Sequence, residues 1–274
     1  MNPTLPHMFD CLVNGELSGH VAVDDRGLHY GDGIFETVAV IHGQPRFWQG
    51  HMDRLAIGCE TLGLPRVPQA LLLRELQTVS AGLASCVVKI LLTRISSGRG
   101  YRPGTTSDCN RVVAAYPFPE DAEQFALHGV DARICNFRLA LQPALAGIKH
   151  LNRLEQVLAA AELARTGTDE GILLDSEDYV ISALSGNLFL VVGDRLLTPR
   201  MDRAGVRGVM RGAILQAFKA RCEQRRVTLD MLRDADEVFC CNAVRGIVPV
   251  RRIGQWIFEP GPRTRELQEW LKPL

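Results

Sequence analysis

Apolar and polar positions follow two rhythms in the first part of the chain. Short apolar runs rich in β-branched residues predict strands over residues 9–13, 35–41, 87–95 and 111–116. Apolar residues recur at helical spacing over 49–62 and 68–83, and the second stretch begins with a proline suited to a first helical turn. We therefore expect strands and helices together in one small α+β domain over residues 1–116.

The second part of the chain mixes the same patterns after a proline-rich break. Pro117 and Pro119 oppose both helix continuation and sheet pairing, so we place an interdomain linker at 117–123. Beyond it, strands are expected at 130–135, 171–174, 188–192, 238–241 and 247–250, and helices at 151–166, 209–225 and 263–271. The chain is thus predicted to be a two-domain α+β protein, with a larger domain over 124–274 and a site in the crevice between the domains.

The sequence motifs argue against a Rossmann domain and against a nucleophilic serine. The predicted elements do not alternate regularly as β-α-β, and no G-x-G-x-x-G sequence follows a predicted strand, which argues against a Rossmann domain. No G-x-S-x-G sequence is present to mark a nucleophilic serine.

Composition and charge exclude several kinds of partner and binding site. The 274 residues are 46% hydrophobic and 23% charged, and 31 acidic residues balance 31 basic ones. With no long basic block, we expect no nucleic-acid partner. Eight cysteines occur without C-x-x-C pairs or zinc-ligand spacing, so we expect reduced thiols and no metal site. Without a signal peptide or an apolar run of about 20 residues, we expect a cytoplasmic protein with no membrane partner.

Lys149 is the residue most suggestive of chemistry. The basic residues include only four lysines, and Lys149 follows a small-residue turn, Ala146-Gly147, and precedes a predicted helix. On such a bend, desolvation would favour the neutral, nucleophilic amine that forms a Schiff base with an aldehyde. A solvated lysine at a helix start also fits this position, so the choice between these two interpretations depends on other residues of the chain.

A phosphate-bearing aldehyde would also need an anion site, and the chain offers three candidates. His51 and Arg54 lie three residues apart, on one face of a predicted helix. Residues 205–208 contain two glycines and precede a predicted helix, whose first N–H groups attract anions. Asn242 and Ala243 follow a predicted strand. Each candidate also fits an ordinary surface helix or turn.

The order of these motifs along the chain carries more information than any of them alone. The motifs are, in sequence, GDGIFET at 31–37, HMDRL at 51–55, GRGY at 98–101, GIKHLN at 147–152, NLF at 187–189, GVRG at 205–208, EVF at 237–239 and PV at 249–250. Together they resemble the fold-type-IV pyridoxal-phosphate enzymes, which include branched-chain and D-amino-acid aminotransferases and aminodeoxychorismate lyases. The resemblance covers about residues 9–255. It implies pyridoxal 5'-phosphate as cofactor, a homodimer, a small N-terminal domain and a larger C-terminal pseudo-barrel.

Within this family, residues 145–158 and 198–211 look like the lyase branch. That likeness implies a lyase that converts 4-amino-4-deoxychorismate to 4-aminobenzoate and pyruvate, a step towards folate. Lys149 would hold the cofactor and act as general base. The resemblance also implies roles for Arg54, Ser182 and the backbone amides of four residues in cofactor binding, and for two residues in binding the substrate carboxylates. The four amides are those of Val206, Arg207, Asn242 and Ala243, and the two substrate-binding residues are Arg99 and Tyr101, with Arg94 and Arg102 as further candidates.

One position departs from the family pattern. Where the family usually carries a glutamate that pairs with the ring nitrogen of the cofactor, this chain has Ser182. A hydroxyl cannot hold that nitrogen protonated as an anion would, so the electron sink should be weaker. Glu177 and Asp178 are the nearby carboxylates in sequence. Two alternatives stay open: an aminotransferase for branched-chain or D-amino acids, and a non-catalytic relative that binds the cofactor.

Overall fold

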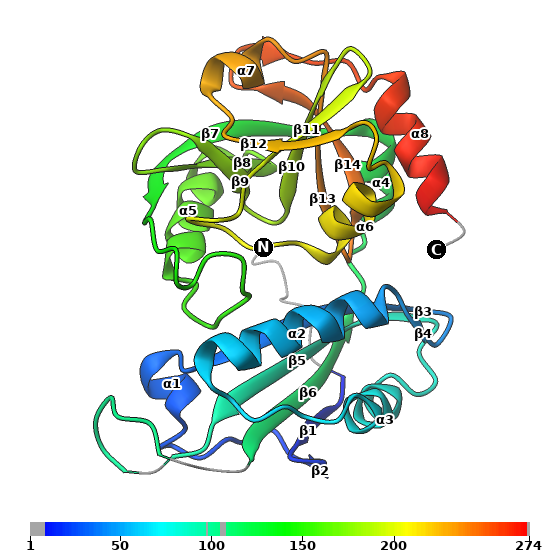
Figure 1. Ribbon diagram of the computed structural model, residues 1–274. Coiled ribbons are helices and arrows are strands. Elements are labelled where there is room, and N and C mark those ends of the chain that lie inside the picture. The colour runs from blue at the N-terminus through cyan, green and yellow to red at the C-terminus, as the bar shows by residue number, and fades with distance from the viewer. Residues whose placement is uncertain (1–8, 97, 105–107, 273–274) are drawn as a thin grey trace. The chain divides into compact units, whose positions relative to one another are not determined.

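The computed structural model describes residues 9–96, 98–104 and 108–272 of the chain. It divides into two compact units (Figure 1). The N-terminal unit runs to Phe118 and also includes Ile148–Asn152, and the C-terminal unit comprises Pro119–Gly147 and the residues from Arg153 onward. The division after Phe118 falls within the linker expected from the two prolines, but the excursion at Ile148–Asn152 has no counterpart in the sequence-based domain boundaries.

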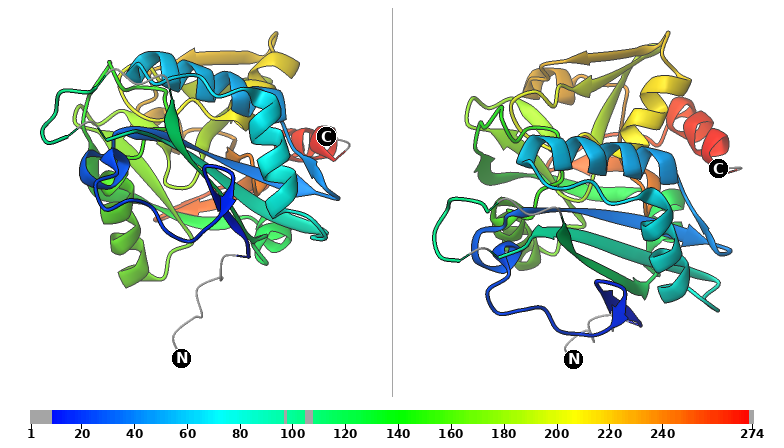
Figure 2. Two further views of the ribbon diagram at one scale, coloured as in Figure 1. Left: turned by 90° about the horizontal axis from the view of Figure 1, so that it is seen from below. Right: turned by 60° about the horizontal axis from the view of Figure 1, so that its bottom comes forward.

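The N-terminal unit is an antiparallel sheet with helices packed against it. Its strands are β1 (Cys11–Val13), β2 (Glu16–Leu17), β3 (Gly33–Ile41), β4 (Gln44–Pro45), β5 (Ser85–Arg94) and β6 (Cys109–Pro117). Its helices are α1 (Arg26–Tyr30), α2 (Trp48–Leu62) and α3 (Gln69–Val79). The strand order is β2-β1-β6-β5-β3-β4, and every neighbouring pair is antiparallel. The turned views of Figure 2 show α2 and α3 lying along this sheet.

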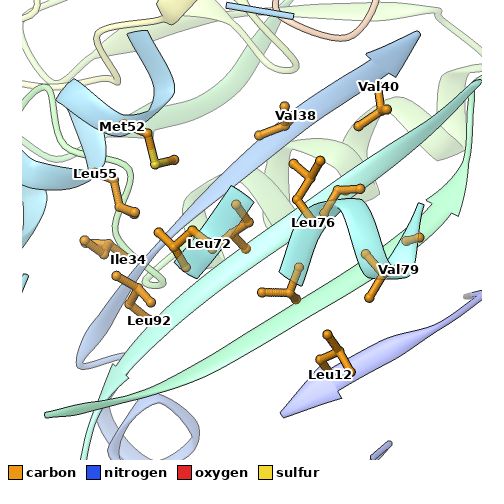
Figure 3. Packing of buried hydrophobic residues seen from close by; sticks show 14 of the residues in the cluster. Leu12, Ile34, Val38, Val40, Met52, Leu55, Leu72, Leu76, Val79 and Leu92 are labelled. Carbon is orange, nitrogen blue, oxygen red and sulfur yellow. The ribbon is translucent and has the colours of Figure 1, made fainter. Parts of the chain in front are cut away.

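The core of this unit forms where the apolar faces of α2 and α3 meet one face of the sheet. Buried side chains from both helices and from β3, β5 and β6 make one cluster, part of which is drawn in Figure 3. In β3 the even-numbered residues Ile34, Val38 and Val40 belong to this cluster, because side chains alternate between the faces of a strand. Phe35 and Thr37 therefore point to the other face, away from the core cluster.

The C-terminal unit is a curled, mixed sheet with helices around it. Its strands are β7 (Val130–Leu139), β8 (Glu170–Asp175), β9 (Val180–Ala183), β10 (Asn187–Val192), β11 (Arg195–Pro199), β12 (Cys222–Arg225), β13 (Glu237–Asn242), β14 (Gly246–Ile253) and β15 (Trp256–Ile257). Its helices are α4 (Ala122–His128), α5 (Leu154–Thr166), α6 (Val209–Ala217), α7 (Leu229–Arg233) and α8 (Pro262–Leu271).

The strand order in this sheet is β12-β11-β10-β13-β14-β7-β8-β9, with β15 paired to β14. A bridge between Val180 of β9 and Val227, just beyond β12, brings the two ends of this order together. The sheet therefore curls towards closure around its apolar core, as expected for a pseudo-barrel. The predicted α+β class with a barrel-like second domain is confirmed.

Three predicted helices are shorter than their sequence patterns suggested: the one expected at 68–83 spans Gln69–Val79, and two others lose residues to pairing with distant strands. The helix expected at 151–166 begins at Leu154, because the residues before it pair with β3. The helix expected at 209–225 ends at Ala217, and Cys222–Arg225 instead forms a strand parallel to β11. In both places, pairing with a distant strand outweighs the local helical pattern.

Candidate active site

Lys149 lies on a short segment that pairs with the first residues of β3. The amide of Phe35 donates to the carbonyl of Lys149 at 2.9 Å, and the amide of Leu151 donates to the carbonyl of Gly33 at 3.0 Å. An antiparallel bridge lies between these two hydrogen bonds. The backbone of Lys149 is therefore held by the sheet and lies outside the helix that sequence reasoning placed next to it.

The side chain of Lys149 lies against an aromatic ring that it shares with a second lysine. Nζ of Lys149 is 4.3 Å from the centroid of the Phe35 ring, and Nζ of Lys89 is 5.1 Å from the same centroid. Burial lowers the pKa of Lys89 below its usual value. Sequence reasoning gave Lys89 no role. The missed signal was a lysine inside a strongly apolar strand, in cross-strand register with Thr37.

Arg54 is held in place by a carboxylate on the core face of β3. Its Nε donates to Oε1 of Glu36 at 2.8 Å and its Nη2 donates to Oε2 at 2.5 Å. Nδ1 of His51 lies 2.6 Å from the same Oε2. Burial alone would raise the pKa of Glu36, but the Arg54 guanidinium and His51 hold it below its usual value. The carboxylate is thus ionised. His51 and Arg54 reach it from the same face of α2, as their spacing predicted, and their role in binding a phosphate stays a prediction.

In the C-terminal unit, the turn at 205–208 is tied to the residues just before the lysine segment. The amide of Gly147 donates to the carbonyl of Gly205 at 2.9 Å, and the amide of Arg207 donates to the carbonyl of Gly147 at 2.9 Å. A Cβ at Gly147, whose φ is +90°, would lie 2.9 Å from Nε of Arg207. The Arg207 amide is therefore engaged with backbone, and the Arg207 side chain covers the Gly147 turn.

A close approach of side chain to backbone fixes the end of the same turn. Nδ2 of Asn187 donates to the carbonyl of Val206 at 2.9 Å. A Cβ at Gly208 would lie 1.9 Å from Oδ1 of Asn187, so this position has room only for glycine. Helix α6 starts immediately afterwards, with no side-chain hydrogen bond capping its first turn. Its N–H groups therefore remain suited to an anion.

The turn that follows β13 is shaped by Asn242. Its Oδ1 accepts from the amides of Val244 and Arg245 at 2.9 and 2.7 Å, and its Nδ2 donates to the carbonyl of Ser185 at 3.2 Å. These bonds determine the course of the backbone at Ala243. The Asn242 side chain thus has a structural task, and only the backbone of this turn is left for the binding role implied by the resemblance.

Ser182 lies buried in β9, opposite Leu173 of β8. The two carboxylates considered as substitutes are occupied elsewhere. Glu177 accepts from both terminal nitrogens of Arg203 at 2.6 Å each, and Asp178 accepts from Nε of Arg138 at 2.8 Å. Both acidic residues are therefore part of ion pairs at the surface of the unit. Neither of them takes over the place of the family glutamate.

A buried carboxylate that sequence reasoning missed lies at the start of β8. Glu170 accepts hydrogen bonds from the amide of Gly171 at 2.9 Å and from the amide and hydroxyl of Ser185. Burial raises the pKa of Glu170 above its usual value. Its only sequence signal was an acidic residue at the edge of an apolar run. The contacts give it a structural role in holding the turn between β9 and β10.

Arg99 and Tyr101 belong to an exposed loop between β5 and β6. Tyr101 is 85% exposed, and Arg99 makes no ion pair with the part of the chain that the structure describes. Arg94, a further candidate for the substrate, is instead buried and paired with Asp32. It is therefore not available to a substrate. Arg102 is exposed in the same loop.

The described ranges contain neither a cluster of metal ligands nor a membrane-spanning helix. Residues 9–96, 98–104 and 108–272 contain no group of three or more His, Cys, Asp or Glu side chains that could hold a metal ion. In the same ranges, no helix combines the length and apolar character needed to cross a membrane.

Comparison with known proteins identifies the family. The family model described as Amino-transferase class IV matches residues 33–253. The chain belongs to this family. Within the class IV aminotransferases, the chain is 35% identical to an aminodeoxychorismate lyase of Vibrio harveyi over 93% of its own length and 97% of that protein. It is 28% identical to a branched-chain-amino-acid aminotransferase of Escherichia coli K12, over 93% of its own length and 89% of that protein.

Two solved structures agree with this assignment. A 4-amino-4-deoxychorismate lyase from Pseudomonas aeruginosa matches with a TM-score of 0.91 and 41% identity, covering 96% of this chain and 98% of that one. A branched-chain aminotransferase from Escherichia coli matches with a TM-score of 0.87 and 26% identity, covering 98% and 95%. The predicted fold type is therefore confirmed.

The class IV aminotransferases are pyridoxal-phosphate enzymes, and pyridoxal 5'-phosphate is the cofactor of this chain. Three features described above fit such a group. A primary amine lies against a neutral ring at Lys149, a guanidinium is fixed by an ion pair at Arg54, and α6 begins without a capping side chain after a glycine-containing turn. These supply the kinds of groups that an aldehyde and a phosphate need.

Proposed function

We propose that this chain is an aminodeoxychorismate lyase, which cleaves 4-amino-4-deoxychorismate to 4-aminobenzoate and pyruvate. The observation that carries the proposal is the likeness to two such lyases, at 35% and 41% identity over almost the whole chain, against 26–28% for the aminotransferases named above. The atoms of the two products add up to those of the substrate, so the reaction needs no oxidant, reductant or second substrate.

Cofactor binding is assigned to the residues that the family resemblance implies. Lys149 holds the aldehyde and Arg54 the phosphate, together with backbone amides near Val206, Arg207, Asn242 and Ala243. Because the Arg207 amide already donates to Gly147, the neighbouring amides and the first turn of α6 carry more of this task. Ser182 contributes a hydroxyl to the ring nitrogen. When bound, the cofactor supplies the electron sink for the reaction.

Lys149 is proposed to be the general base. Its amine takes the proton from the substrate ring carbon that bears nitrogen. The carbon–oxygen bond to the enolpyruvyl group then breaks, and the same amine returns a proton to the methylene carbon of the departing group, which yields pyruvate. The Phe35 ring lies beside this amine and excludes water from one side. One residue can therefore serve both proton transfers.

Ser182 fits a lyase better than an aminotransferase. The substrate ring becomes aromatic as the enolpyruvyl group leaves, and this gain reduces the need for a strongly electron-withdrawing cofactor ring. Amino transfer gains no such driving force and depends more on an anion that keeps the ring nitrogen protonated. Glu177 and Asp178 are engaged in ion pairs, so neither of them supplies that anion.

The substrate carries two carboxylates, which require cationic or hydroxyl donors. Arg99 and Tyr101 are proposed to bind one of them from the exposed loop. Lys89 is proposed as a third donor, because its amine shares the Phe35 ring with Lys149. Together these groups would favour a dianionic substrate over a neutral amino-acid side chain.

A homodimer in the cytoplasm is proposed as the working form. Helix α5 exposes Leu154, Val157 and Leu158 at 76%, 57% and 54%. Their i, i+3, i+4 spacing places them on one helix face, and such a stripe supports contact with a second copy. The eight cysteines are all free, and burial raises the pKa of each of them, which fits a reducing compartment.

The activity test uses the holoenzyme with aminodeoxychorismate, and pyruvate is measured through lactate dehydrogenase. We expect stoichiometric pyruvate and 4-aminobenzoate from the wild type, and none from Lys149→Ala. Lys219→Ala is the matched control, because Lys219 is an exposed lysine just past α6. Transfer of an amino group from D-alanine or leucine to 2-oxoglutarate, without pyruvate from aminodeoxychorismate, would instead establish an aminotransferase.

A further inference from the structure

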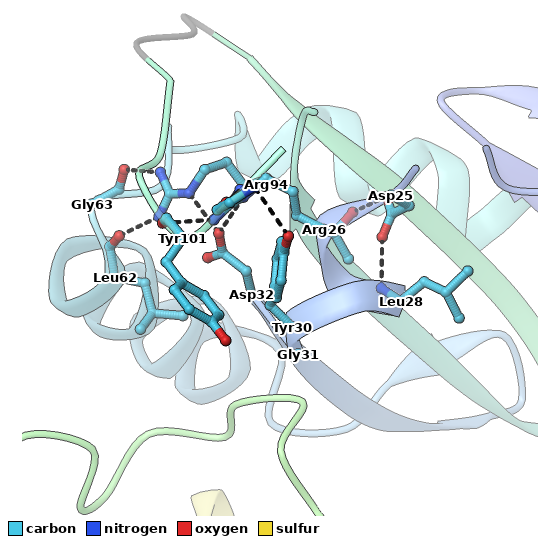
Figure 4. Close-up of polar contacts among 12 residues, drawn as sticks. Asp25, Arg26, Leu28, Tyr30, Gly31, Asp32, Leu62, Gly63, Arg94 and Tyr101 are labelled. Atoms are coloured by element: carbon cyan, nitrogen blue, oxygen red, sulfur yellow. Dashed lines mark hydrogen bonds and ion pairs between the residues drawn. The ribbon is translucent and has the colours of Figure 1, made fainter. Parts of the chain in front are cut away.

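Two buried arginines of the N-terminal unit share one carboxylate. Arg26 and Arg94 each donate from Nε to Oδ2 of Asp32, at 2.8 and 2.9 Å (Figure 4). The two arginines are 3% and 7% exposed. Two cations against one carboxylate leave excess positive charge in a buried position, so their remaining N–H groups need good acceptors.

Arg94 uses its remaining N–H groups to cap the C-terminal end of helix α2. Its Nη1 donates to the carbonyl of Gly63 at 2.9 Å and its Nη2 to the carbonyl of Leu62 at 2.5 Å. These carbonyls lie at the C-terminal end of α2, which carries a partial negative charge. The position of Arg94 is thus explained by the stability of the fold.

Arg26 uses the corresponding N–H groups of its own guanidinium to bind a loop. Its Nη1 donates to the carbonyl of Gly100 at 2.9 Å and its Nη2 to the carbonyl of Tyr101 at 3.0 Å. These carbonyls belong to the exposed loop between β5 and β6, not to a helix end. A buried guanidinium therefore fixes the backbone of two consecutive residues in this loop.

The aromatic residues around this loop reinforce the same arrangement. The amide of Gly100 donates to the hydroxyl of Tyr30 at 3.3 Å, and the rings of Tyr30 and Tyr101 pack edge to face at 5.4 Å. The Arg26 guanidinium lies 4.8 Å from the centroid of the Tyr30 ring. Gly100 has a φ of +96°, which a side chain would oppose. The backbone around Tyr101 is thus held although Tyr101 itself is exposed.

Arg26 is itself anchored to the sheet. The carboxylate of Asp25 accepts from the amide of Leu28, from the hydroxyl of Thr93 at 2.6 Å and from Nδ2 of Asn110 at 2.8 Å. Asp25 therefore caps α1 and ties it to β5 and β6. Asp25 is thus bonded to the sheet, and the next residue in the chain, Arg26, is bonded to the carbonyls of the loop.

We propose that Arg26 is a positioning residue that determines substrate affinity by fixing the direction in which Arg99 and Tyr101 project. This inference rests on the proposed function, in which these two side chains bind a substrate carboxylate. Within the loop, Arg26 bonds the backbone carbonyls of Gly100 and Tyr101, so it acts on a substrate through these residues. Its loss should weaken substrate binding much more than it slows the proton transfers at Lys149.

The test is Arg26→Lys in the holoenzyme. A lysine keeps the charge but presents a single nitrogen, so it cannot bond Asp32 and both loop carbonyls in the same geometry. We expect KM for aminodeoxychorismate to rise about tenfold, as for one lost charge-assisted hydrogen bond, with kcat changed by less than about threefold. Cofactor absorbance should be unchanged. Tryptic cleavage after Arg99 should accelerate about fivefold or more, because the loop opens more often.

Two further variants keep the result interpretable. Arg111→Lys changes an arginine of the same unit that pairs with Glu75 instead of with the carbonyls of Gly100 and Tyr101, so KM and cleavage after Arg99 should stay at wild-type values. Tyr30→Phe removes only the hydroxyl that accepts from Gly100, and should raise KM about twofold to threefold even if Arg26→Lys does not fold.

The outcomes separate this inference from the proposed function. Absence of pyruvate from the wild type would overturn the proposed function and the substrate role of Arg26 with it. Normal pyruvate release with an unchanged KM in Arg26→Lys and Tyr30→Phe would overturn the role of Arg26 alone, whether or not cleavage after Arg99 accelerates. A raised KM with faster cleavage and an intact kcat supports it.

Discussion

Arg54 and Glu36 form a two-point ion pair, with Nε 2.8 Å from Oε1 and Nη2 2.5 Å from Oε2. The carboxylate lies on a strand and the guanidinium on the helix that covers it, and both side chains are largely buried. A two-point pair fixes the plane of the guanidinium. The direction of its other N–H groups is thereby fixed as well, which matters if Arg54 binds the phosphate.

Glu36→Gln should therefore weaken both the fold and cofactor binding. Removing the charge leaves Arg54 buried without its counter-ion, and we expect a loss of about 3 kcal/mol in the free energy of unfolding. Affinity for pyridoxal phosphate should fall about tenfold as Arg54 loses its fixed orientation. Urea unfolding of the apoprotein and a cofactor titration measure the two effects. Glu75→Gln, which breaks the pair with Arg111, should lower stability but leave cofactor affinity intact.

Lys149 and Lys89 share the Phe35 ring, but they should respond differently to substitution. Lys149→Met should abolish fixation of the cofactor by borohydride and reduce pyruvate production at least about a thousandfold, because the general base is lost. Lys89→Met should leave fixation intact and raise KM, since only a carboxylate donor is removed. Mass spectrometry after reduction and steady-state kinetics distinguish the two. Loss of fixation in Lys89→Met would contradict this division of roles.

Gly208 and Gly212 offer a matched pair of glycines. A Cβ at Gly208 would collide with Oδ1 of Asn187, whereas a Cβ at Gly212, inside α6, would meet nothing within 4 Å. Gly208→Ala should thus lower stability by about 1–3 kcal/mol and weaken cofactor binding, because the turn before α6 must shift. Gly212→Ala should raise stability by about 1 kcal/mol. Thermal unfolding of the two variants beside the wild type is the measurement.

Glu170 should give the protein a characteristic dependence on pH. Burial raises the pKa of this carboxyl above its ordinary value of 4.5, so the folded state holds the proton more tightly than the unfolded state. The stability contributed by Glu170 is therefore fully present below pH 4.5 and is lost as pH rises through the raised folded value. Glu170→Gln should make the free energy of unfolding less dependent on pH in this range. The difference between wild-type and variant unfolding free energies, measured at several pH values, reports it; a pH-independent difference would contradict the assignment.

The exposed stripe on α5 predicts how the assembly responds to substitution. Replacing both Leu154 and Leu158 by serine should shift the protein from dimer to monomer, because about 1.5–3 kcal/mol of apolar burial is lost for each leucine. Size-exclusion chromatography with light scattering gives the mass directly. Val192→Ser on β10 changes another exposed apolar residue outside the stripe and should leave the mass unchanged.

Local patterns were sufficient for most of the fold. The strands of the N-terminal unit and the helix over α2 follow directly from side-chain alternation and helical spacing, because these elements meet one apolar core. The pattern was insufficient where pairing partners lie far away. Cys222–Arg225 follows a helix in the sequence but forms a strand that pairs with β11. Nothing in the neighbouring sequence indicates that partner.

The candidate site was predictable to a similar extent. The order of motifs gave Lys149 and Arg54, and the helical spacing explained why His51 and Arg54 reach the same carboxylate. The sequence did not indicate a role for Glu36, Lys89 or Arg26, because the role of each depends on contacts that only the structure shows. The glutamate lies on a core face, the lysine beside an aromatic ring, and the arginine beneath a loop.

Ile148–Asn152 belongs to the N-terminal unit, whereas the residues on either side of it belong to the other. During synthesis, β3 must therefore wait for more than a hundred further residues before its partner segment leaves the ribosome. A fragment ending at Phe118 would expose the unpaired edge of β3 and would carry no reactive amine of Lys149. Under the proposed function, capture of the aldehyde at Lys149 thus requires a segment that is synthesised only after the whole sheet of the N-terminal unit.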